Sequence, residues 1–87
     1  MQFDEITGVL RGLLIRLDDR LALRDVTLLA EFIDAGEFGL ALEQIADVLS
    51  ADAHALTRDE RADMLSLVSR MRMDDRVHRA LTSCPSR

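Results

Sequence analysis

The chain has 87 residues, the size of a single domain, and 48% of them are hydrophobic, which is enough to build a compact core. Only three residues are aromatic and only one is a cysteine, so the composition argues against an aromatic-rich β-sheet and excludes a disulfide framework within one chain. The formal net charge is −5, and where the charges lie along the chain is more informative than this total.

The first predicted helix covers residues 4–21, where apolar residues recur every three or four positions. Ile6, Leu10, Leu13 and Leu17 would form its buried face. Gly8 and Gly12 lie one turn apart on the same helix, and a glycine inside a helix costs about 1 kcal/mol relative to alanine. We interpret them as sites where a neighbouring helix approaches closely.

The next two predicted helices cover residues 26–35 and 37–50. Asp25 is the expected N-cap of the first, because its carboxylate can accept from free backbone N–H groups. Gly36 is expected to end this helix in the left-handed conformation. The connection is very short, so the two helices should form a tight αα-hairpin.

Residues 51–56 are expected to form a loop. The following residues, Thr57 to Glu60, match the capping box, in which a threonine and a glutamate cap the start of a helix reciprocally. This helix should reach Met71, and a short last helix should cover residues 75–81, leaving residues 82–87 as a frayed tail. The sequence therefore predicts one all-α domain over residues 1–87, a compact bundle of four to five short helices.

Acidic residues are concentrated in the middle of the chain. Residues 25–56 contain seven acidic residues and no arginine or lysine. Glu43 and Asp47 are four positions apart on one helix, and Glu31 and Asp34 are three apart on another, so like charges repel. Such a face is tolerated when a positively charged partner uses it, although acidic runs also occur merely as solvated surface. For Glu37 and Asp25 the helix dipole alone is a sufficient explanation.

No catalytic or metal-binding pattern is found. His54 lies in a predicted loop and His78 between two arginines, and neither belongs to a recognised zinc motif. Cys84 lies in the predicted tail, away from any structured histidine partner. We therefore expect a protein that is not an enzyme and that needs no cofactor or metal.

The sequence also argues against nucleic acid and membrane as partners. The second and third predicted helices could be mistaken for a DNA-binding helix-turn-helix. However, the third contains acidic residues and no arginine or lysine that could bind DNA phosphates. The N-terminus lacks the basic region of a signal peptide, and no apolar stretch is long enough to span a bilayer. A cytoplasmic location is expected.

Residues 31–49, EFIDAGEFGLALEQIADVL, resemble the hallmark of the MafI-type immunity proteins, small bacterial proteins encoded beside polymorphic toxins. The family pattern is an acidic DAGE turn followed by GLALE, apolar residues and an aspartate. A later helix with a Ser or Thr cap ends near a methionine, and Thr57 to Met71 resembles it. The resemblance covers about residues 20–75, and neither the first helix nor the tail is diagnostic.

The resemblance implies that the protein binds and neutralises a cognate toxin domain with a basic surface, often a nuclease. The candidate partner-binding residues are all acidic: Glu31, Asp34, Glu37, Glu43 and Asp47. Gly36, Gly39, Leu40, Ala41 and Leu42 of the same motif look structural. The alternative is a small adaptor or structural domain without a toxin partner, which would self-associate by packing a second copy against the first helix at Gly8 and Gly12.

Overall fold

Five helices form the regular structure of the described residues, which are residues 2–87 of a computed structural model with side chains described from Asp4 onward. They are α1 (Gln2–Arg16), α2 (Leu23–Asp34), α3 (Phe38–Ala51), α4 (Arg58–Arg70) and α5 (Asp75–Ser83). The prediction of an all-α bundle of four to five short helices is confirmed.

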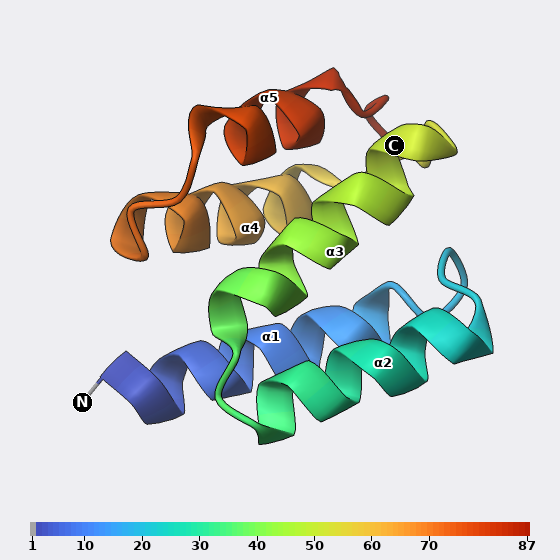
Figure 1. Cartoon of the computed structure of the whole chain (residues 1–87). Coiled ribbons are helices and arrows are strands. Elements are labelled where there is room, and N and C mark those ends of the chain that lie inside the picture. Colours follow the sequence, from blue (N-terminus) through green and yellow to red (C-terminus); the bar gives the residue numbers. More distant parts are fainter. Residues whose placement is uncertain (1) are drawn as a thin grey trace.

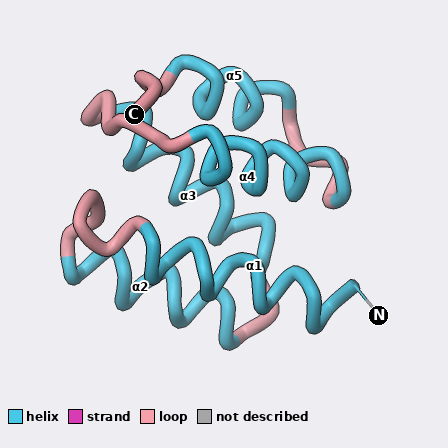
Figure 2. Tube along the Cα trace, turned by 180° about the vertical axis from the view of Figure 1, so that it is seen from behind, coloured by secondary structure: helices cyan, strands magenta, loops and turns pink. Residues whose placement is uncertain are grey.

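The helices are arranged as two antiparallel pairs joined by a diagonal helix. α1 runs beside α2, and α4 runs beside α5, while α3 crosses from the end of the first pair to the second (Figure 1). Seen from behind, α1 and α4 lie in front of α3 (Figure 2). α3 packs mainly on α2 and α5, and the whole has extents of 32 × 27 × 20 Å.

The core is built from aliphatic side chains contributed by all five helices. Leu10 and Leu13 of α1, Leu29 of α2 and Leu42 of α3 are fully buried. Met64 of α4 and Leu81 of α5 meet them from the second pair. The periodicity of the sequence predicted most of these buried faces, because apolar positions three and four apart lie on one side of a helix.

Two helix boundaries differ from the sequence-based prediction by three residues or more. α1 ends at Arg16 rather than near residue 21, and the Arg20 side chain turns back to donate to the Arg16 carbonyl at 2.8 Å. α2 begins at Leu23, because the Ala22 carbonyl accepts the first hydrogen bonds of the helix. Asp25 therefore lies in the first turn of α2 and is not its N-cap.

The predicted capping box at the start of α4 is confirmed. The Thr57 hydroxyl accepts from the Glu60 backbone N–H at 3.1 Å, and the Glu60 carboxylate accepts from the Thr57 N–H at 2.9 Å. Asp74 caps α5 by accepting from the Arg76 N–H at 3.2 Å.

The turn at Gly36 also has the predicted conformation. Gly36 has a φ of 76°, its N–H donates to the Ile33 carbonyl, and the Glu37 N–H donates to the Phe32 carbonyl. This pair of hydrogen bonds is the Schellman motif. The ends of α3 and α4 repeat it with Ala53 (φ 51°) and Arg72 (φ 52°) in the left-handed position, where glycine is usual.

The C-terminal residues are attached to the bundle, which contradicts the frayed tail expected for residues 82–87. The Leu56 N–H donates to the Pro85 carbonyl at 2.9 Å, and the Arg87 N–H donates to the Leu56 carbonyl at 2.8 Å. Cys84 is buried, and Arg61 donates to the carbonyls of Leu81 and Pro85.

Gly8 and Gly12 are not sites of close helix approach within the chain. A Cβ atom built at either position would meet no atom within 4 Å. Our interpretation of these two glycines as intramolecular packing sites is therefore wrong. None of the described helices is both long and apolar enough to cross a membrane.

Candidate partner-binding surface

The five acidic candidate residues lie along the α2–α3 hairpin. Glu31 and Asp34 belong to the last turns of α2, Glu37 is the N-cap of α3, and Glu43 and Asp47 follow on α3. Glu31, Asp34, Glu37 and Asp47 are exposed, and Glu43 is half-buried. All five therefore have solvent access, but they do not share one environment.

Three of the five take part in ion pairs with arginines of other helices. Asp34 accepts from Arg11 of α1 at 2.6 Å, and Asp47 accepts from Arg76 of α5 at 2.8 Å. Glu43 lies 4.0 Å from the same Arg76 guanidinium. The repulsion expected between Glu43 and Asp47 is therefore relieved by a cation that the sequence places 29 residues or more away.

These ion pairs direct the acidic side chains toward two different helices. Asp34 is directed toward α1, while Glu43 and Asp47 are directed toward α5. The hydrogen bond that Arg76 donates to Asp47 raises the pKa of Arg76 above its ordinary value, with further contributions from Glu43 and Asp74. Both pairs are largely exposed, and exposed ion pairs contribute little to stability because water and salt screen them, so a competing cation could replace either arginine.

Glu31 and Glu37 have no ion-pair partner among residues 4–87. They lie on either side of the turn at Gly36, at the end of α2 and the start of α3. Their charges are therefore not compensated by contacts within the described part of the chain. The structure thus distinguishes two free acidic residues from three paired ones, a distinction that the sequence did not predict.

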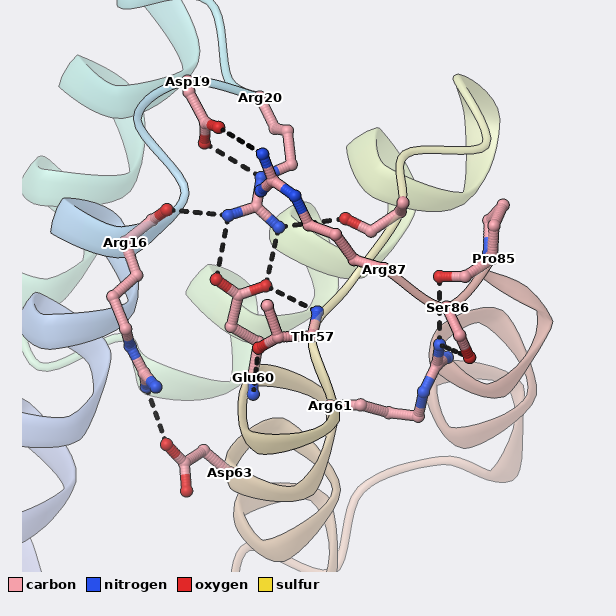
Figure 3. A network of polar contacts seen from close by, with 11 residues as sticks. Arg16, Asp19, Arg20, Thr57, Glu60, Arg61, Asp63, Pro85, Ser86 and Arg87 are labelled. Carbon is pink, nitrogen blue, oxygen red and sulfur yellow. Dashed lines mark hydrogen bonds and ion pairs between the residues drawn. The ribbon is translucent and has the colours of Figure 1, made fainter.

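A second group of charges is buried and joins the turn after α1, the loop before α4 and α4 itself (Figure 3). Arg20 donates to both carboxylate oxygens of Glu60, at 2.6 and 2.8 Å, and to the Ala55 carbonyl at 2.9 Å. The Arg20 and Glu60 side chains are only 9% and 5% exposed. The hydrogen bonds from Arg20 lower the pKa of Glu60 to about 2. No buried side-chain nitrogen or oxygen atom among the described residues lacks a hydrogen-bond partner, and we therefore assign this cluster a structural role.

The residues considered for catalysis are not brought together. His54 lies 3.7 Å from Asp52 in the loop after α3, His78 is exposed on α5, and Cys84 is buried beyond the end of α5. Burial raises the pKa of the Cys84 thiol. Within the described residues there is no group of three His, Cys, Asp or Glu side chains that could hold a metal ion, and no pocket.

Comparison with protein-family models, with curated proteins and with solved structures finds no match to this chain. The geometry of the described residues and the sequence motif are therefore the basis of the functional argument.

Proposed function

We propose that the protein is an immunity protein that binds and neutralises a cognate bacterial toxin domain through the acidic α2–α3 hairpin, and that it acts without catalysis. The observation that carries the proposal is the charge of this hairpin. Residues 25–56 hold seven acidic residues and no arginine or lysine, and Glu31 and Glu37 have no ion-pair partner among the described residues.

The proposed partner presents a basic surface, such as the phosphate-binding cleft of a nuclease toxin. Complementary charge speeds the encounter of two proteins and selects the partner more than it sets the final affinity. Glu31 and Glu37 would meet the basic surface first, because no arginine of the chain competes for them. Asp34, Glu43 and Asp47 would follow by exchanging Arg11 and Arg76 for cations of the toxin, at small cost because both pairs are exposed.

The first test is a protection assay in the cytoplasm of a bacterial host. The C-terminal domain encoded immediately upstream of this protein is expressed with and without it, and growth is followed. The proposal expects that the domain kills alone and that co-expression restores growth. A domain that is harmless, or that kills in both cases, contradicts the proposal for that pair.

The contact face is tested by neutralising the two free acidic residues. We expect the Glu31→Gln/Glu37→Gln variant to weaken toxin binding about ten-fold at low salt, which corresponds to about 1.4 kcal/mol, and to keep its helicity. The matched control is Asp18→Asn/Asp59→Asn, which removes two exposed acidic residues outside the hairpin that have no ion-pair partner among the described residues. Calorimetry at two salt concentrations measures both.

Equal affinity of the hairpin variant and the control would show that the acidic hairpin is not the contact face. The protection result would then stand without this assignment. A loss that disappears at high salt, where charges are screened over about 3 Å at 1 M, would support an electrostatic contact.

A further inference from the structure

The outward face of α1 has no side chain at two of its positions, because both are glycines. Gly8, Gly12 and Ile15 follow one another at spacings of four and three and therefore share one side of the helix. Gly8 is exposed, both glycines have open space around them, and Ile15 is 74% exposed. Neither glycine adopts a left-handed conformation, so nothing in the described chain requires a glycine at either position.

Charged residues border this face on both edges in the same order. Asp4 and Arg11 are seven positions apart and lie along one edge, while Glu5 and Arg16 lie along the other. On each edge the acidic residue is nearer the N-terminal end and the arginine nearer the C-terminal end. Within the chain, Arg11 pairs with Asp34, Glu5 with Arg70, and Arg16 with Asp63, whereas Asp4 has no ion-pair partner among the described residues.

This order of charges is self-complementary for two antiparallel copies. In such a dimer the two-fold axis lies in the interface, perpendicular to the two helices. It places each edge of α1 beside the same edge of α1 in the other copy, with the two edges running in opposite directions. Asp4 of one copy then lies toward Arg11 of the second copy, and Glu5 toward Arg16. A parallel arrangement would instead place like charges together.

We propose that the chain forms a homodimer in which α1 of each copy crosses α1 of the other, antiparallel, at Gly8 and Gly12. The bare backbone at the two glycines lets the helices approach closely, and Ile15 of each copy packs on the other. This surface lies on α1, outside the acidic α2–α3 hairpin, and the two surfaces share only the ion pair between Arg11 and Asp34. The proposal goes beyond toxin binding and does not depend on it. It also explains why a helix with two interior glycines is retained although they leave it less stable than alanines would.

One helix pair is small compared with the roughly 1,000 Å² or more that specific interfaces bury. We therefore expect a weak dimer, visible by sedimentation equilibrium of the full chain between about 10 µM and 1 mM, in the micromolar-to-millimolar range of dissociation constants. The weight-average mass should rise with concentration, from that of the monomer toward twice that value.

The decisive variant is Gly8→Gln/Gly12→Gln. Because both positions are open, the larger side chains should fit the monomer and raise its melting temperature at low concentration, since glutamine favours a helix more than glycine does. The same side chains would block the close crossing, so the dimer should weaken at least ten-fold. Gly39→Gln is the matched control, because Gly39 lies in α3 with the same open space.

Asp4→Arg tests the orientation. An arginine at position 4 would face Arg11 of the second copy and should weaken the antiparallel dimer several-fold at low salt, with less effect at high salt. A chain that stays monomeric at 1 mM would overturn the proposal. So would a dimer that persists unchanged in the Gly8→Gln/Gly12→Gln variant, or one that Gly39→Gln weakens equally.

Discussion

Arg20 uses every donor of its side chain. Its guanidinium makes five hydrogen bonds, to the side chains of Asp19 and Glu60 and to the carbonyls of Arg16 and Ala55. An arginine has five N–H donors, so none is left without a partner. The Glu60 carboxylate accepts from Arg20 and also from the Thr57 N–H of the capping box of α4, so it takes part in both the buried ion pair and the helix cap.

Because the pKa of Glu60 is low, the free energy of unfolding should depend on pH in the acidic range. The folded-state pKa is about 2, against an ordinary value of 4.5. The ionised pair thus contributes its full stability above about pH 5, and this contribution, about 3 kcal/mol, is lost as the pH falls from about 4.5 to 2. Urea denaturation across this range should show the decline.

The variant Glu60→Gln should lower the free energy of unfolding at pH 7 by about 3 kcal/mol, because it leaves the buried Arg20 charge with only the half-exposed carboxylate of Asp19 as its counter-ion. Its deficit relative to the parent should shrink toward pH 2. Asp63→Asn is the control on the same helix, since its ion pair with Arg16 is exposed and worth less than about 1 kcal/mol. Equal effects of the two substitutions would contradict the assigned role of burial.

Helix ends show which elements can be predicted from sequence. The Thr57–Glu60 box and the turn at Gly36 were predictable because each depends on residue types at a fixed local spacing. The same Schellman geometry at Ala53 and Arg72 was not predictable, because neither residue type favours the left-handed conformation. The early start of α2 was missed for a similar reason, since Ala22 offers no side-chain cap.

Glycine should stabilise the ends of α3 and α4. We expect Ala53→Gly and Arg72→Gly each to raise the free energy of unfolding by about 1 kcal/mol, because glycine adopts a positive φ without steric cost. Gly36→Ala should lower it by a similar amount. Thermal unfolding followed by circular dichroism measures all three, and a lower stability of Ala53→Gly would contradict the assigned φ.

At the scale of the whole molecule, contacts between distant segments determine which charges remain free. Periodicity indicates which side of a helix is buried but not which helix packs beside it. The pairing of Asp34 with Arg11 and of Asp47 with Arg76 was therefore beyond sequence reasoning, and so was the attachment of the C-terminal residues. The acidic composition of residues 25–56 was readable from the sequence, whereas the distinction between free and paired acidic residues required the fold.

Removing residues 85–87 should lower the free energy of unfolding by about 2 kcal/mol. The backbone N–H and carbonyl of the buried Leu56 would lose their partners, and each unsatisfied buried group costs about 1–3 kcal/mol before water compensates. Pro85→Ala is the control, because it keeps the carbonyl that Leu56 uses. A truncated chain as stable as the parent in urea would show that this attachment contributes nothing.

The ion pairs between distant segments also affect the time that the chain needs to fold. Glu5 pairs with Arg70 and Asp19 with Arg87, contacts that join residues 65 and 68 positions apart. Helices alone form within about a microsecond, but loops of this length must close before such contacts can form. Folding of the whole chain should therefore be slower than formation of its isolated helices, because segments distant in the sequence have to meet.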